Sequence, residues 1–273
     1  MTASNQRALT ATVIAIVSPA SRDEAGATLS ALSRGAGVRP VIITLGDSPE
    51  AQRRDDGGAI VIDGLIPRYL DNAVASLRLS SLPAVAWWRA GEAGVLVDLA
   101  RLVDRVVLDL EDPSGAWPLV PRIAELTAVS DVRWARLTRW RSLVAQFFDV
   151  PEVRAARYDR VAIAGADPHL ARLFGGWLRS RLPGGAGVDV VRERREGAAL
   201  ESVELAGPDG RLAVRLLSNG RCLETVVEMR SGHAASRVVA LGDDSLAALV
   251  SEELRVRSRD LAFEDAVRET EQA

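Results

Sequence analysis

The chain has 273 residues, of which 48% are apolar and 26% charged, so it can bury a sizeable core and is not of the disordered class. Its net charge of -3 at pH 7 argues against a general nucleic-acid binder. The sequence contains no lysine, and all 34 of its basic residues other than histidine are arginines. This excludes Schiff-base chemistry on lysine and the phosphate-binding lysine of a P-loop. A single cysteine, Cys222, excludes an intramolecular disulfide.

The apolar run near the amino terminus predicts a first strand. It extends from Ala8 to Val17, follows the single charge of Arg7, and is interrupted by Thr10 and Thr12, which fits a strand better than a signal peptide. No segment approaches the roughly 18 continuous apolar residues of a membrane span. We therefore expect a cytoplasmic protein that does not bind membranes.

Short apolar runs alternate with helical patterns in the first half of the chain. Strands are expected at 12–17, 40–45, 59–63, 84–88 and 105–110, and helices at 22–34, 67–79 and 95–102. Continuous apolar strands that alternate with helices are typical of a mostly parallel sheet covered on both faces. The pattern predicts a Rossmann-like α/β domain over 1–150, ending in a mainly helical, Trp/Arg-rich segment.

The second half begins with another strand, at 160–165. Asp167 is expected to cap the helix that follows, with Pro168 as its first residue and Arg181 near its end. Alternating patterns then predict strands at 202–207, 212–218 and 222–229, separated by glycine-containing hairpin turns. Helices are expected at about 243–256 and 259–270. We expect an α+β domain with an antiparallel sheet over 151–273.

A search for catalytic motifs finds none. There is no G-x-G-x-x-G, because GAGVRP at 35–40 breaks down at Pro40, and there is no G-x-S-x-G. His169 and His233 are the two histidines, so H-E-x-x-H is impossible. Asp109 and Glu111 would share a strand face, but such charges at the end of a strand are more often solubilising than metal-binding. No catalytic, cofactor or metal site is predicted.

The stretch SDVRWARLTRWRSLVAQFFD at 130–149 holds two of the six tryptophans and four arginines. If Thr138 caps a helix, one apolar face follows with i, i+3, i+4, i+7 spacing. That face consists of Trp140, Leu143, Val144 and Phe147. A buried helix explains the pattern, yet Trp and Arg are also enriched at protein–protein hot spots, and Arg binds phosphate.

A second cluster, Trp87, Trp88 and Arg89, lies at the end of an expected strand. Adjacent residues of a strand point to opposite faces, so the two tryptophans must point apart. Burial on both faces of a parallel sheet explains this arrangement without a function. An exposed tryptophan would instead suit binding.

These segments resemble the family of OpcA, the glucose-6-phosphate dehydrogenase assembly protein. SLPAVAWWRAG at 81–91 and DRVVLDLED at 104–112 resemble two consecutive family segments. DVRWARLTRWRSLVAQFFD at 131–149 is similar to the most specific family signature, although Arg139 stands where that signature has proline. SLAALVSEELRVRSRDLAFEDAV at 245–267 resembles a segment near the family's carboxyl terminus. The matches occur in the family's order.

The resemblance implies a non-catalytic protein that binds glucose-6-phosphate dehydrogenase and promotes its assembly or active oligomeric state, without a cofactor. The family-signature residues would bind the partner or build the scaffold that presents the binding surface. They are Trp87, Trp88, Arg89, Trp134, Arg136, Leu137, Thr138, Trp140 and Arg141. The alternative is a sugar-phosphate or nucleotide-binding α/β protein or enzyme that uses an arginine-rich anion site.

Overall fold

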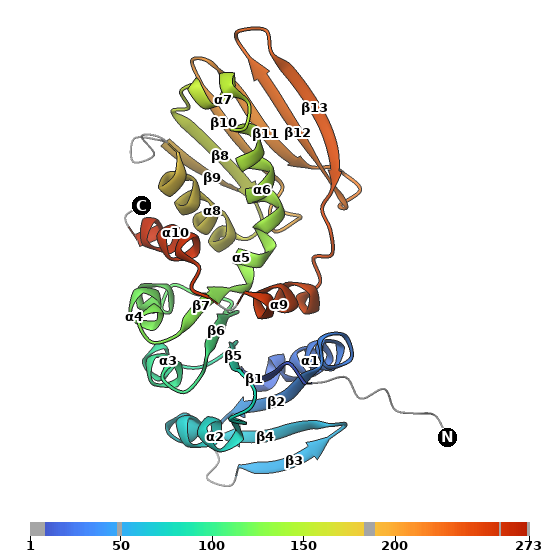
Figure 1. Cartoon of the computed structure of the whole chain (residues 1–273), viewed down its shortest axis with the longest axis vertical. Helices are drawn as coiled ribbons and strands as arrows, with labels where there is room; N and C mark the ends of the chain where they lie inside the picture. Colours follow the sequence, from blue (N-terminus) through green and yellow to red (C-terminus); the bar gives the residue numbers. More distant parts are fainter. Residues whose placement is uncertain (1–8, 48–50, 183–188, 257, 272–273) are drawn as a thin grey trace, which may run out of the picture. The chain divides into compact units, whose positions relative to one another are not determined.

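Figure 1 shows a computed structural model of the chain, which describes residues 9–47, 51–182, 189–256 and 258–271. Two compact units form: unit 1 is Met1–Val132 with Ser245–Asp260, and unit 2 is Arg133–Asp244 with Leu261–Ala273. Ala8, where the amino-terminal apolar run begins, lies outside the described residues. The division describes contacts, and it assigns the late segment Ser245–Asp260 to unit 1. The expected boundary near residue 150 concerns domains that fold separately, and it stays a prediction.

Unit 1 is built on a seven-stranded sheet with the order β3-β4-β2-β1-β5-β6-β7. Its strands are β1 (Ala11–Val17), β2 (Val38–Leu45), β3 (Gln52–Asp56), β4 (Ala59–Leu65), β5 (Ala84–Trp88), β6 (Arg105–Leu108) and β7 (Ala128–Asp131). Every pair of neighbours is parallel except β3 and β4. The parallel strands follow the 3-2-1-4-5-6 order of the doubly wound fold. The predicted Rossmann-like parallel sheet is therefore confirmed.

Helices cover both faces of this sheet (Figure 1). They are α1 (Arg22–Ala36), α2 (Leu70–Leu77), α3 (Ala93–Ala100), α4 (Val120–Ala124) and α9 (Leu246–Arg255), with the short 3-10 turns η1 (Pro19–Ser21), η2 (Pro67–Tyr69) and η3 (Trp117–Leu119). α9 packs beside α1, whereas α2 packs against α3, and α3 against α4. All seven residues of β1 are buried, as a central strand between two helical layers requires.

Unit 2 contains a six-stranded mixed sheet with the order β13-β12-β11-β10-β8-β9. Its strands are β8 (Arg160–Gly165), β9 (Asp189–Arg194), β10 (Ser202–Gly207), β11 (Gly210–Leu216), β12 (Cys222–Met229) and β13 (Ala234–Ala240). β8 and β9 are parallel, and all other neighbours are antiparallel. The predicted antiparallel hairpins are confirmed, and β9 and β13 extend the sheet at its two edges.

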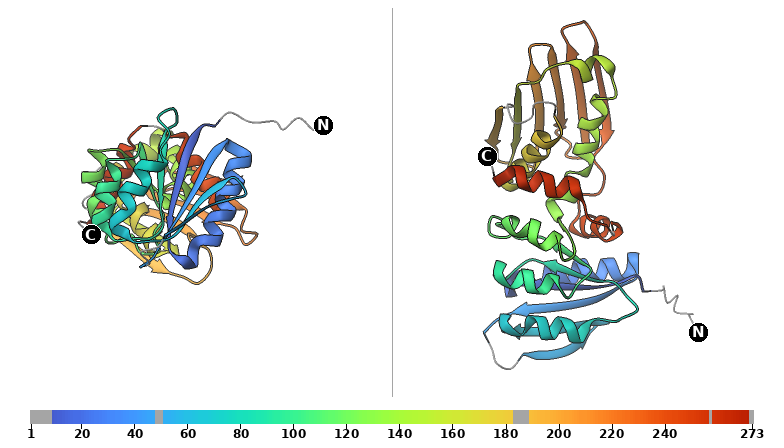
Figure 2. Two further views of the ribbon diagram at one scale, coloured as in Figure 1. Left: turned by 90° about the horizontal axis from the view of Figure 1, so that it is seen from below. Right: turned by 60° about the vertical axis from the view of Figure 1, so that its left-hand side comes forward.

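The helices of unit 2 are α5 (Val132–Arg136), α6 (Thr138–Phe147), α7 (Pro151–Ala155), α8 (Pro168–Arg181) and α10 (Leu261–Glu271). α8 packs against β8, β9 and α10, and α6 contacts β11, on the same face of the sheet (Figure 2). Asp167 caps α8 as predicted, because its Oδ1 accepts from the N–H groups of His169 and Leu170 at 2.9 and 3.1 Å. In the described residues, every helix is too short or too polar to cross a membrane.

Candidate functional site

The first Trp/Arg cluster lies at the carboxyl end of β5. Trp87 and Trp88 are both fully buried, and Trp87 Nε1 donates to Asp109 Oδ2 at 3.1 Å. Gly91 has a φ of 123°, and a Cβ there would lie 2.6 Å from the Trp88 ring, so this turn is closed tightly over the ring. Burial on both faces of the sheet therefore explains the two adjacent tryptophans, and neither ring is exposed for binding.

Arg89 follows Trp88 and lies just beyond the carboxyl end of β5. Its backbone N–H donates to the carbonyl of Ile16 at 2.9 Å, and its guanidinium pairs with Glu24 at 2.6 Å and with Asp109 at 2.9 Å. The same guanidinium lies over the Trp87 ring, 5.1 Å from the centroid. Arg89 thus stands between the carboxyl ends of β1 and β5, which is the topological switch point where open α/β sheets bind ligands.

Asp109 belongs to this network rather than to a metal site. The strand expected at 105–110 ends at Leu108, so Asp109 and Glu111 do not share a strand face, contrary to the sequence prediction. Asp109 turns toward Trp87 and Arg89 because these two donors satisfy its carboxylate. Among the described residues, no group of three His, Cys, Asp or Glu side chains is placed to hold a metal ion.

The turn between β1 and α1 does not fit a dinucleotide, the ligand that doubly wound folds often hold there. A pyrophosphate needs glycine for close approach and free N–H groups at the start of the helix. Residues 18–21 read SPAS, contain no glycine, and include Pro19, which has no N–H. Asp23 and Glu24 occupy the first turn of α1, where they would repel an anion.

The signature cluster of unit 2 is centred on Trp134, which is 2% exposed. The Arg141 guanidinium lies 3.4 Å from the centroid of the Trp134 ring, and Phe263 of α10 packs against that ring at 5.7 Å. Arg141 NH2 also donates to the Trp134 carbonyl and to Thr138 Oγ1, each at 3.2 Å. Arg141 therefore connects Trp134 and Thr138, and Phe263 extends the stack from α10.

The apolar face predicted for α6 is confirmed. Its buried residues are Trp140, Leu143, Val144 and Phe147. The predicted cap is wrong, because Thr138 is the first helical residue and Leu137 precedes it as the N-cap. Leu137 has a helical backbone, donates to the carbonyl of Arg133, and accepts from the N–H of Arg141, so the chain passes from α5 into α6 without an extended capping residue.

The other three arginines of the segment 130–149 contact other segments of unit 2. Arg133 pairs with Asp167 at 3.0 Å, Arg136 pairs with Asp244 at 3.0 Å, and Arg139 Nε donates to the carbonyl of Ala240 at 3.2 Å. These partners lie 34 to 108 residues away in sequence, so no local pattern could have indicated them. The arginines therefore hold α5 and α6 to the cap of α8 and to the end of β13, and they do not converge on an anion site.

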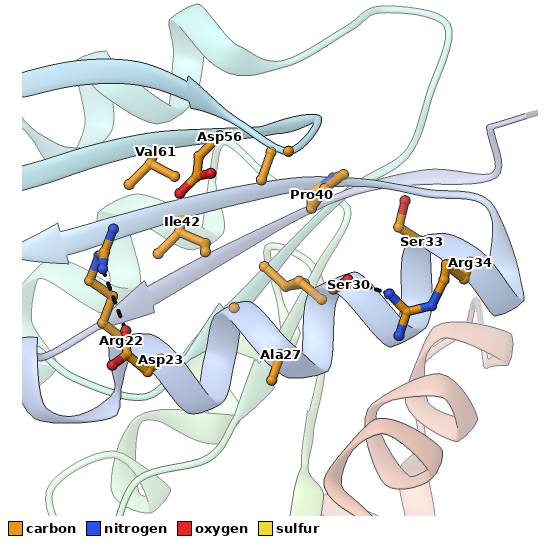
Figure 3. A pocket seen from close by; sticks show the side chains of 14 residues that line it. Arg22, Asp23, Ala27, Ser30, Ser33, Arg34, Pro40, Ile42, Asp56 and Val61 are labelled. Carbon is orange, nitrogen blue, oxygen red and sulfur yellow. Dashed lines mark hydrogen bonds and ion pairs between the residues drawn. The ribbon is translucent and has the colours of Figure 1, made fainter.

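A groove of about 440 Å³ lies beside α1, between this helix, β2 and the β3–β4 hairpin (Figure 3). In a doubly wound fold a helix connects the second and third parallel strands, and here β3 replaces that helix. The groove is lined by Ile42 and by two arginines, Arg22 and Arg34. Both arginines already have partners, since Arg22 pairs with Asp63 at 3.1 Å and Arg34 donates to Ser30 at 2.6 Å. The groove thus follows from the topology and is not an arginine-rich anion site.

Comparison with known proteins connects these features to a family. Residues 127–267, just over half of the chain, match the OpcA family profile, which describes the C-terminal domain of the glucose-6-phosphate dehydrogenase subunit. A protein of Nostoc punctiforme named as an OxPP cycle protein OpcA is 33% identical over 132 residues, which are 44% of this chain and 27% of that protein. A protein of Synechocystis sp. with the same name is 29% identical over 124 residues, 41% of this chain and 26% of that protein. The matched part of the chain spans about a quarter of these relatives' length.

Solved structures resemble the chain in fold. An oxidoreductase from Sinorhizobium meliloti superposes with a TM-score of 0.59 at 10% identity, over 97% of this chain and 96% of that one. At this identity the likeness shows the fold alone. It agrees with the predicted α/β class, a mostly parallel sheet followed by a second sheet of α+β type.

Proposed function

Since this chain belongs to the OpcA family, we propose that it is a non-catalytic partner of glucose-6-phosphate dehydrogenase in the pentose phosphate pathway. In this role it binds the dehydrogenase and promotes its assembly or active oligomeric state. The observation that carries the proposal is the match at 127–267, which contains the whole signature of α5 and α6 and continues into α10.

Two features support a role without turnover. The β1–α1 turn lacks glycine and carries Asp23 and Glu24 where a nucleotide phosphate would lie. His169 is in the first turn of α8 and His233 follows β12, so both histidines belong to unit 2. The Arg89 guanidinium pairs with two carboxylates of its own unit, those of Glu24 and Asp109. The switch point of this fold is therefore built as an internal ion network, which suits a binding protein better than an enzyme.

The signature residues have two proposed roles, which follow from their exposure and their contacts. The buried residues are Trp87, Trp88, Trp134, Leu137 and Trp140. The half-buried residues are Arg89, Arg136 and Arg141, and Thr138 is exposed. We assign the buried group to the scaffold, together with Arg89, which is held by Glu24 and Asp109, and Arg141, which is held by Trp134. We assign Arg136 and Thr138 to contact with the dehydrogenase. A partner without chemistry of its own activates an enzyme only by binding the active form better than the inactive form.

The test is the activity of glucose-6-phosphate dehydrogenase from the same organism, with and without the full chain, together with co-elution on a sizing column. We expect higher activity and a shared peak. A dehydrogenase that neither binds the chain nor gains activity would overturn the proposal. The matched control is Arg268→Gln, because Arg268 is 55% exposed, pairs locally with Asp265 on α10, and lies outside the signature.

One observation favours a second candidate, a ligand-binding protein. Arg89 lies at the switch point, and its NH1 is buried without a hydrogen-bond partner in the described part of the chain. A phosphate or carboxylate oxygen is a suitable acceptor for such a donor. The test is thermal stabilisation by NADP or sugar phosphates in the absence of dehydrogenase, with loss of the effect in Arg89→Met. No stabilisation of the wild-type chain would remove this candidate.

A further inference from the structure

The strand β13 forms one edge of the sheet in unit 2. It reads AASRVVA, carries one charge, at Arg237, and has six exposed residues, with Val239 half-buried. Val238 is 57% exposed, and among the large apolar side chains of the described residues only Leu261 is more exposed, at 63%. Within the part of the chain that the structure describes, β13 pairs with β12 alone. Its outer side is therefore a row of backbone groups that a further strand can extend.

The other edge strands are protected against such pairing. Charged residues on an edge discourage a second molecule from adding a strand. β3 reads QRRDD with all five residues exposed and four of them charged, and β9 reads DVVRER with four charges among six residues. β7, the remaining edge strand, has four residues and is buried. β13 has neither proline nor a run of charges, so it stands apart from the other three.

The register between β12 and β13 decides which backbone groups point outward. The flanking hydrogen bonds run from Met229 N–H to the His233 carbonyl and from Leu241 N–H to the Arg221 carbonyl, each at 2.8 Å. In an antiparallel pair such bonds recur at every second residue, so the odd-numbered residues of β13 direct their N–H and C=O groups to β12. The backbone groups of Ser236 and Val238 therefore point away from the sheet.

We propose that β13 pairs antiparallel with β13 of a second copy of this chain, about a twofold axis beside Val238. In this register Val238 faces Val238 of the second copy, and Ser236 faces its Ala240. The outward backbone groups of both strands then hydrogen-bond to each other. A contact of this kind uses one surface twice and closes on itself, which gives a dimer rather than a filament. It does not depend on whether the chain also binds the dehydrogenase.

Charge and side-chain size select this register and this partner. An axis beside Arg237 would place two arginines directly opposite each other, where like charges destabilise the pairing. An axis beside Ser236 would place Val238 opposite the small Ala234. With the axis beside Val238, Arg237 faces the uncharged Val239 and keeps its hydrogen bond to Gln146 of α6. The strand is therefore complementary to itself, without the acidic residue that a foreign strand would need to pair with Arg237.

Cysteine cross-linking tests the register in the full chain, with Cys222→Ser as the background. The two residues at the axis would have Cα atoms about 5.5 Å apart, within the range that a disulfide spans. We expect Val238→Cys to form a covalent dimer under mild oxidation and Ser236→Cys to form little, because its two copies would lie four residues out of register. Faster cross-linking by Ser236→Cys than by Val238→Cys would overturn the proposal.

Sedimentation equilibrium tests the dimer without a cross-link. We expect the wild-type chain to dimerise and Val238→Arg, which places two like charges at the axis, to raise the dimer dissociation constant roughly tenfold or more. Thr10→Arg, an exposed position in unit 1, is the matched control and should dimerise as the wild type does. A wild-type chain that stays monomeric, or a Val238→Arg dimer of unchanged affinity, would overturn the proposal. Cross-linking of Val238→Cys to the dehydrogenase instead of to itself would also overturn it.

Discussion

Unit 1 holds a buried guanidinium and unit 2 a half-buried one, and the two are stabilised by different contacts. Arg105 in unit 1 is 4% exposed, pairs with Glu253 of α9 at 2.6 Å, and donates to the carbonyl of Val256 at 2.8 Å. Arg141 in unit 2 stacks on the Trp134 ring. The first arginine is paired with an opposite charge, and the second lies against an aromatic face, so Trp134 contributes a contact to the arginine as well as to the apolar core.

The largest effect is expected at Arg105. Arg105→Met leaves the Glu253 carboxyl buried without its cation, which should lower the free energy of unfolding by roughly 3–5 kcal/mol. The double variant Arg105→Met/Glu253→Met should recover most of this loss, because it removes both polar groups from the interior. Chemical denaturation of the wild type, of the single variants Arg105→Met and Glu253→Met, and of the double variant measures the coupling. A loss below about 1 kcal/mol, like that expected for the exposed control Arg268→Met, would contradict it.

This pair also shows what the sequence could not reveal. The apolar runs of β1, β2, β4 and β5 predicted the parallel strands, because strands buried on both faces read as continuous apolar stretches. The contact between Arg105 and Glu253 joins positions 148 residues apart, and together with the packing of α9 beside α1 it connects α9 to unit 1. Local patterns predict elements and do not report which distant element covers them.

The edge strands were missed for a related reason. β3 reads QRRDD and β13 reads AASRVVA, and neither has the alternation of a half-buried strand because neither is covered well enough to need it. In the signature, the spacing of α6 predicted its buried face, and the hot-spot composition left open whether the tryptophans were exposed. Their burial was decided by partners such as Phe263, more than a hundred residues later in the chain.

A smaller loss is expected at Arg141. Arg141→Met removes a cation that is stacked on Trp134 and two hydrogen bonds, while it keeps much of the aliphatic packing. We expect a loss of about 2 kcal/mol in the free energy of unfolding. Arg141→Lys keeps the charge and loses the planar stacking, so it should fall between the wild type and Arg141→Met. Equal stabilities of the lysine and methionine variants would contradict this order and show that the positive charge alone adds no stability at this position.

The stability of the Arg105–Glu253 pair should depend on pH. Burial raises the pKa of Glu253 above its ordinary value of 4.5, and Arg105 and Ser130 only partly oppose this effect. The folded state therefore keeps the proton longer than the unfolded state, and the associated stabilisation is lost as pH rises from 4.5 through the raised pKa. The unfolding free energy of the wild type relative to Glu253→Gln should fall over this range. An opposite slope would mean that Arg105 outweighs burial.

The smallest effect on stability is expected at Arg136. A variant at this position is therefore the most direct test of the proposed contact with the dehydrogenase. Its pair with Asp244 is partly in solvent, with the two side chains 28% and 47% exposed. Arg136→Gln should therefore change the free energy of unfolding by no more than about 0.5 kcal/mol. Trp140→Ala cannot serve this purpose, because Trp140 is 3% exposed on the buried face of α6 and its removal should cost roughly 3–5 kcal/mol.

Because Arg136→Gln preserves the scaffold, it isolates the exposed part of the signature. If unit 2 presents this arginine to glucose-6-phosphate dehydrogenase, the variant should activate the enzyme less than the wild type at equal concentration, whereas the exposed control Arg268→Gln should activate it fully. Both variants must first give the wild-type melting temperature within a few degrees. Full activation by Arg136→Gln would place the contact elsewhere, and the signature of unit 2 would then serve, like Arg105 in unit 1, to hold distant segments together.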